Sequence, residues 1–274
     1  MWEIKRADSA IFVFIRVRQK LSPILKRNQS GEKMFSGYDF KVYWGVRKES
    51  PAEIARRMSK MLRKLKPMSP LLNAWATDAM DPDGHRISTT TKGLEPIIAK
   101  GVSRNDVDRS IDEEFGFSKS ICNAFDDGSF VALRVHAGCW SEFLHNSLVL
   151  NFPMITDVIR PLLSVEGILQ ILRILIECWE PDSAHFDSSF LSKDLDWPKI
   201  NFNETECRWV SYHPHSDWEW PELPEEVEVI EEKRGRFLVL IDDTFAETGT
   251  GDVELVRRTR SILAEHYDQG SGED

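Results

Sequence analysis

The chain has 274 residues, of which 41% are hydrophobic and 29% charged, with nine tryptophans and fifteen phenylalanines. This composition excludes a disordered chain or a small disulfide-dependent scaffold, and it predicts a packed core. Its 35 basic and 45 acidic side chains give a net charge of −10, which disfavours nucleic acid or an anionic membrane as a partner and suits a basic protein.

The first 33 residues differ in charge from the rest of the chain. They carry a net charge of +5, so residues 34–274 carry −15. The segment ends in a flexible Asn-Gln-Ser-Gly stretch just before Met34. We expect residues 1–33 to be a basic extension, either a genuine arm or a stretch upstream of a native start at Met34.

The next part of the sequence predicts one strand and a series of helices. The aromatic and β-branched run Phe40–Val46 is typical of a strand. Ser50-Pro51-Ala52-Glu53 forms a capping box, and apolar residues at helical spacing follow it up to Leu65. Shorter helices are expected over Pro70–Ala79, Leu94–Ala99 and Asn105–Phe115, with a polar loop at Asp81–Thr91.

An antiparallel meander and a buried helix are expected in the middle of the chain. Turn sequences separate three short strand patterns, Phe117–Phe125, Phe130–Ala137 and Ser147–Phe152. Val165–Trp179 is apolar nearly all round, which predicts a helix packed against this sheet.

The last third combines a polar stretch with further strands and a final helix. We expect a long excursion over Asp182–Glu206, strands over Cys207–His213 and Arg236–Asp242, an amphipathic helix over Asp252–His266, and a disordered tail at 268–274. Parallel βαβ repetition is absent. The predicted fold is therefore a single α+β domain over residues 34–267, with a mostly antiparallel sheet packed with several helices.

Signatures of catalysis and of targeting are weak. The sequence has no phosphate loop, GxSxG or HExxH pattern, and its four cysteines stand singly. Three ligand-type side chains, His213, His215 and Asp217, lie within five residues but have no identifiable fourth ligand. We expect no catalytic residue, metal or cofactor, no membrane segment, and a cytoplasmic location. A metal-dependent hydrolase using those three residues stays open as an alternative.

An acidic segment, residues 217–232, is the strongest candidate for a partner site. Half of its sixteen positions are acidic and none is basic, and tryptophans and prolines are interleaved with them. Aromatic anchoring combined with a negative field suits a basic partner such as a nuclease, whose groove must be positive to hold phosphates. The alternative is a solvated edge strand protected from aggregation. The predicted partner contacts are Trp218, Glu219, Trp220, Glu222, Glu225, Glu226 and Glu228.

The order of several motifs resembles immunity protein family 52 of bacterial polymorphic toxin systems. These motifs are Tyr43–Ser50 with the helix to Leu65, Pro70–Leu72 with Trp75, Phe115–Ser118, Trp209–Tyr212 and Gly235–Leu240. The resemblance covers most of residues 36–266. It implies a non-enzymatic α+β domain that binds and neutralises a toxin encoded by a neighbouring gene, often a restriction-endonuclease-like nuclease. An adaptor without inhibitory activity would make the same kind of contact, so it also stays open.

Overall fold

The computed structural model describes residues 37–78, 85–124, 130–154, 156–189, 191, 207–215 and 219–270. All of them belong to one unit, Phe35–Asp274. The predicted basic extension, residues 1–33, lies outside the described residues. No helix in the described ranges is long and apolar enough to cross a membrane.

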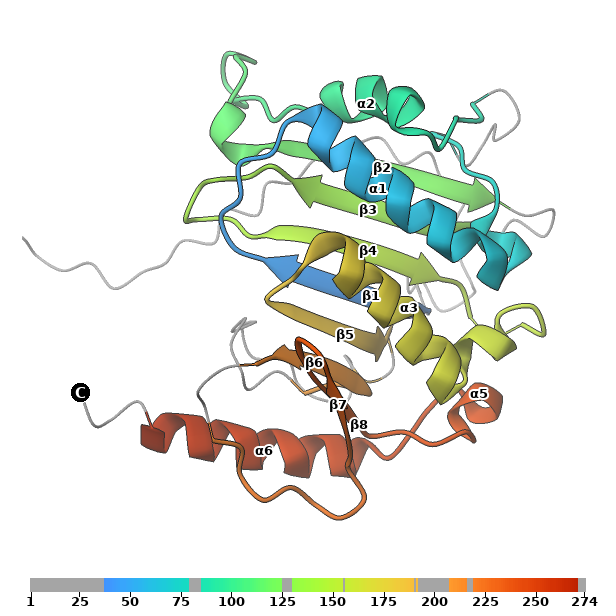
Figure 1. The fold of residues 1–274 in the computed structure, drawn as a ribbon, viewed down its shortest axis with the longest axis vertical. Coiled ribbons are helices and arrows are strands. Elements are labelled where there is room, and N and C mark those ends of the chain that lie inside the picture. The colour runs from blue at the N-terminus through green and yellow to red at the C-terminus, as the bar shows by residue number, and fades with distance from the viewer. Residues whose placement is uncertain are drawn as a thin grey trace, which may run out of the picture. The chain divides into compact units, whose positions relative to one another are not determined.

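An eight-stranded sheet forms the centre of this unit (Figure 1). Every pair of neighbouring strands is antiparallel, and their order is β2-β3-β4-β1-β5-β6-β8-β7. The strands are β1 (Tyr38–Trp44), β2 (Phe117–Ala124), β3 (Phe130–Ala137), β4 (Asn146–Phe152), β5 (Ser183–Ser188), β6 (Val210–Pro214), β7 (Glu228–Glu232) and β8 (Gly235–Val239). The single α+β domain and the β2-β3-β4 meander are confirmed.

Helices cover one face of the sheet and enclose the core. Figure 1 shows α1 (Pro51–Leu65) and α3 (Val165–Trp179) crossing the same face, with α2 (Thr91–Ala99) beside α1. Successive side chains of a strand point to opposite faces of the sheet, so every second residue of β1 faces the helices. These are residues 38, 40, 42 and 44, and all four are buried. Trp179 of α3 stacks on Trp44 at 5.1 Å between ring centroids and donates a hydrogen bond to Met61 Sδ of α1. The core therefore joins β1 and α1, which follow each other in the chain, to α3, which is distant from both in sequence.

Local sequence signals determine the two long helices of this layer. Both α1 and α3 have the predicted bounds. Ser50 Oγ accepts a hydrogen bond from the Glu53 backbone, and Glu53 accepts one from the Ser50 backbone, which completes the predicted capping box.

The final helix, α6 (Val253–Gly270), extends four residues beyond the predicted end at His266. Residues 271–274 lie outside the described part.

Two predicted helices were wrong because backbone groups find other partners. Pro70–Leu72 forms only a 3-10 turn, since Ala76 pairs with Cys122 of β2 through two backbone hydrogen bonds of 2.7 and 2.9 Å. In 105–115 only Glu113–Phe115 is helical, as a 3-10 turn. Asn105 and Asp108 accept hydrogen bonds from backbone N–H groups two residues on, which competes with helix formation.

The excursion predicted over Asp182–Glu206 was wrong in its first part, because β5 is a central strand of the sheet. The sequence of β5, SAHFDS, reads as polar, but five of its six residues are buried. Asp187 lies 3.8 Å from both Lys41 of β1 and Arg208. These basic partners, distant in sequence, compensate the buried carboxylate. Residues 192–206 lie outside the described residues.

Candidate functional site

The described part of the acidic segment runs along α6 and then forms the outermost strand of the sheet. Among the described strands, β7 pairs with β8 alone and forms one end of the strand order. Arg258 of α6 donates to Glu226 Oε1 at 2.9 Å, and His266 Nε2 lies 2.7 Å from the Glu219 carbonyl. Figure 1 shows this stretch passing beside α6 before it enters β7. Trp218 and Asp217 lie outside the described residues.

Internal ion pairs divide the carboxylates of this segment into two groups. Glu226 pairs with Arg258, Glu231 with Arg236 at 3.4 Å, and Glu232 with Arg173 at 2.8 Å. Within the described ranges the other four, Glu219, Glu222, Glu225 and Glu228, make no ion pair, and all four are exposed. The uncompensated negative charge of this surface therefore comes from these four carboxylates.

Glu226 differs from its neighbours because its charge is already committed to α6. A hydrogen bond within its own residue, followed by the hydrogen bond from Arg258, lowers the pKa of Glu226. The carboxylate thus stays ionised, and the Arg258 guanidinium of the same chain balances its charge at the surface. Among the carboxylates predicted to contact a partner, Glu226 therefore has the least uncompensated negative charge.

Trp220 contributes to the folded core. Its ring is half-buried and packs against the core, in edge contact with His213 at 4.9 Å between ring centroids. The Arg236 guanidinium lies over the ring, 5.0 Å from its centre. Only part of this side chain is open to a partner.

His213 and His215, two of the three residues of the alternative metal-dependent hydrolase, lie in different surroundings in the structure. His213 is buried beside Trp220, whereas His215 is exposed and its Nε2 lies 3.1 Å from the Glu232 carbonyl. Asp217 lies outside the described residues. In the ranges that the structure describes, no group of three or more His, Cys, Asp or Glu side chains could hold a metal ion.

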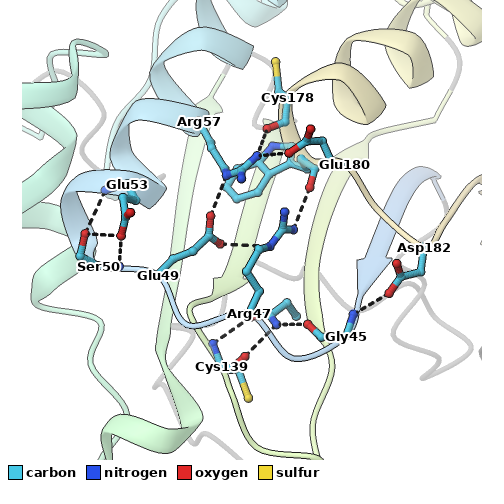
Figure 2. Close-up of polar contacts among 12 residues, drawn as sticks. Gly45, Arg47, Glu49, Ser50, Glu53, Arg57, Cys139, Cys178, Glu180 and Asp182 are labelled. Carbon is cyan, nitrogen blue, oxygen red and sulfur yellow. Dashed lines mark hydrogen bonds and ion pairs between the residues drawn. The ribbon is translucent and has the colours of Figure 1, made fainter. Parts of the chain in front are cut away.

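A second polar cluster surrounds Glu49, in the loop between β1 and α1 (Figure 2). Glu49 is 7% exposed, accepts a hydrogen bond of 2.6 Å from Arg57 Nε and lies 3.5 Å from Arg47 Nε. Arg47 also donates to the Trp179 carbonyl at 2.7 Å, and Arg57 to the Cys178 carbonyl at 3.0 Å. The cluster thus binds the loop to the C-terminal end of α3, where helix carbonyls lack partners within the helix.

This cluster stabilises the fold, and its pKa shifts give no sign of a catalytic group. Burial lowers the pKa of Arg47, whereas Glu49 and Glu180 outweigh burial and raise the pKa of Arg57. Burial also raises the pKa of the nearby Cys178 thiol to about 11, so this cysteine is not an activated nucleophile. Sequence reasoning missed the cluster. One feature of the sequence could have indicated it: Glu49 is a charged residue between a predicted strand and the cap of the next helix.

Comparisons with known proteins give one family match. A family model described as Immunity protein 52 matches residues 36–266, which include all eight strands. The comparison with curated proteins gave no match. Among solved structures, the Pseudomonas aeruginosa T6SS protein PA0821 is similar, with a TM-score of 0.46 and 10% identity, covering 86% of this chain and 76% of that chain. A likeness at this level carries no argument about function.

Proposed function

The chain belongs to the Immunity protein 52 family, and from this membership we propose that it neutralises a basic nuclease toxin by binding it through the acidic segment. Family membership gives the chain an immunity role and a cognate toxin as its partner. The nuclease character of the toxin, its origin in a neighbouring gene, and the contact surface on this chain belong to the proposal.

The single observation that carries the proposal is the group of exposed, unpaired carboxylates at Glu219, Glu222, Glu225 and Glu228. A nuclease holds phosphates in a positively charged groove. Carboxylates presented from an extended segment would occupy such a groove in place of phosphates. Inhibition of this kind requires binding alone and no catalytic residue on the immunity protein.

The charge of the body supports rapid capture of such a partner. Residues 34–274 carry a formal charge of −15. A strong negative field accelerates the association of a basic protein. Added salt screens this field, so that at 0.1 M ionic strength little of it extends beyond about 10 Å. The proposal therefore predicts association that slows as salt is raised.

The test is a calorimetric titration of the full chain with the toxin domain encoded by the adjacent gene, at low and high salt. We expect nanomolar one-to-one binding that weakens with salt. The double variant Glu225→Gln/Glu228→Gln should bind about tenfold or more weakly at low salt, because two unpaired carboxylates are lost.

The matched control is Glu95→Gln/Glu247→Gln, which removes the same charge from exposed positions outside the acidic segment that make no ion pair within the described ranges. It should change the affinity much less. Equal losses in both double variants would show that net charge, and not this surface, governs binding. No binding by the wild type at either salt would reject that toxin as the partner and would overturn the proposed function.

A further inference from the structure

Four large apolar side chains are exposed at the end of the sheet where β3 turns into β4. Phe143 is 91% exposed and Trp140 42%, in the loop between these strands; Leu144 follows at 37% and Val46, in the loop after β1, at 58%. We call these four residues the Phe143 patch. Exposed apolar side chains that gather on neighbouring loops mark interaction surfaces, whereas single ones do not.

The loops that carry the patch are tied together by hydrogen bonds. The Asn146 side chain donates to the carbonyls of Gly45 and Cys139 at 2.6 and 2.9 Å, and accepts from the Cys139 backbone at 2.9 Å. The Arg47 backbone donates to the Cys139 carbonyl at 3.0 Å. Figure 2 shows Gly45, Arg47 and Cys139 lying together. The patch is therefore presented on an ordered base.

Close packing restricts this base further. Gly138, at the start of the β3–β4 loop, has a φ of +76°, and an added Cβ there would lie 2.7 Å from the Glu49 carbonyl. The Trp140 backbone donates to the Glu114 carbonyl, in the 3-10 turn before β2, at 3.0 Å. A side chain held on such a loop loses less conformational entropy when it binds a partner than one on a free loop.

Carboxylates border the patch. Glu114 is tied to Trp140 through the backbone, Glu113 precedes it, and Glu142 lies between the two aromatic residues. None of these three makes an ion pair within the described ranges, while the Lys48 ammonium lies over the Trp140 ring at 5.1 Å. An aromatic centre with a charged rim is the usual composition of a protein interface. This rim favours a basic surround on the partner and disfavours anionic lipid or a second copy of this chain.

We propose that the Phe143 patch is an anchoring contact for the toxin, with Phe143 seated in an apolar pocket that basic side chains surround. This inference rests on the proposed function, and it adds a contact surface distinct from the acidic segment. Five strand spacings separate β4 from β7, which corresponds to about 24 Å. A partner that contacts both surfaces spans this part of the sheet.

The experiment measures the affinity of the same toxin domain for full-length wild type, Phe143→Ser and Phe143→Leu at low and high salt. Loss of an aromatic anchor from an interface weakens binding by about 30-fold or more, so we expect this loss for Phe143→Ser. Phe143→Leu should retain most of the affinity because it keeps an apolar side chain. The ratio of Phe143→Ser to wild type should be the same at both salts, since the lost contact carries no charge.

Val158→Ser is the matched control, because Val158 is an exposed valine at 51% that lies beyond the opposite end of β4. It should bind like the wild type. Since Phe143 is exposed, Phe143→Ser should unfold at the wild-type temperature, which separates lost contact from lost folding. Wild-type affinity in Phe143→Ser would overturn this inference and leave the proposed function intact. Absence of binding by the wild type itself would overturn the proposed function and this inference with it.

Discussion

At the scale of single residues, Glu49 decides how the β1–α1 loop joins the helical layer. It is a buried carboxylate between two guanidinium groups, Arg47 and Arg57, that also satisfy the last carbonyls of α3. A buried ion cluster adds little net stability relative to a well-packed apolar one, but removal of one member leaves the others uncompensated. The cluster therefore makes the joint specific, and it is vulnerable to a single substitution.

We expect Glu49→Gln to lower the free energy of unfolding by about 2 to 3 kcal/mol, because two partly buried cations lose their shared carboxylate. Urea denaturation measures the change. Glu177→Gln is the control: Glu177 binds Lys60 and Lys64 at 3.1 and 2.9 Å, but its side chain is half exposed. Exposed pairs contribute less than about 1 kcal/mol. Similar losses in the two variants would contradict the structural role of Glu49.

A second residue-scale prediction concerns the pH dependence of stability. Burial lowers the pKa of His136, so the folded state resists protonation while the unfolded state binds a proton below about pH 6.5. In the window below pH 6.5 and above the lowered pKa, the unfolded state thus holds more protons and stability rises with pH, by at most about 1.4 kcal/mol per unit. His136→Asn should reduce this slope in denaturation curves measured between pH 5 and pH 7. An unchanged slope would assign the dependence to other groups.

At the scale of elements, the ends of α1 are set by local chemistry. Ser50 caps the first turn, Pro51 occupies the first helical position, and Glu53 completes the capping box. The hydrogen bonds from the Ser50 backbone and hydroxyl also lower the pKa of Glu53. These contacts involve neighbours in sequence, so the helix start was predictable without knowledge of the fold.

Two serine-to-alanine substitutions in the same region separate capping from helix propensity. Ser50→Ala removes the cap and should cost about 1 kcal/mol of stability. Ser59→Ala, inside α1, should leave stability unchanged or raise it by a few tenths of a kcal/mol, because alanine is the better helix former. Thermal unfolding of both variants measures the difference. A larger loss in Ser59→Ala would contradict this assignment of the helix start.

At the scale of the whole molecule, the sheet separates two surfaces that the proposals assign to one toxin. The Phe143 patch lies at the β3–β4 end, and the unpaired carboxylates lie near β7, the outermost strand on the other side. Substitutions more than about 10 Å apart without shared partners usually have additive effects. The apolar patch and the acidic segment should therefore act independently in binding.

Additivity of the two surfaces can be measured in a double-mutant cycle. Phe143→Ser combined with Glu225→Gln/Glu228→Gln should lose the sum of the separate binding free energies, within about 0.5 kcal/mol. Titration calorimetry at low salt supplies the four affinities. A coupling well above that value would show that the two surfaces are not independent in the complex.

The sequence by itself determined the elements whose signals are short-range. The capping box placed α1, and a run that is apolar nearly all round placed α3. Short strand patterns separated by turn residues placed the β2-β3-β4 meander and with it the α+β class. The acidic segment was also visible, because charge is read directly from composition. Each of these signals depends on residues within a few positions of one another.

Only the tertiary structure decided which side chains meet across the sheet. It made the polar β5 a central strand, because Lys41 and Arg208 compensate Asp187. It also assigned Glu226 to Arg258 and left its neighbours unpaired. Phe143, which hydrophobicity alone would place inside, is exposed on a loop that is hydrogen-bonded to Gly45 and Arg47 of the β1–α1 loop. These outcomes depend on partners far away in sequence, and strand order, which no local pattern specifies, brings those partners together.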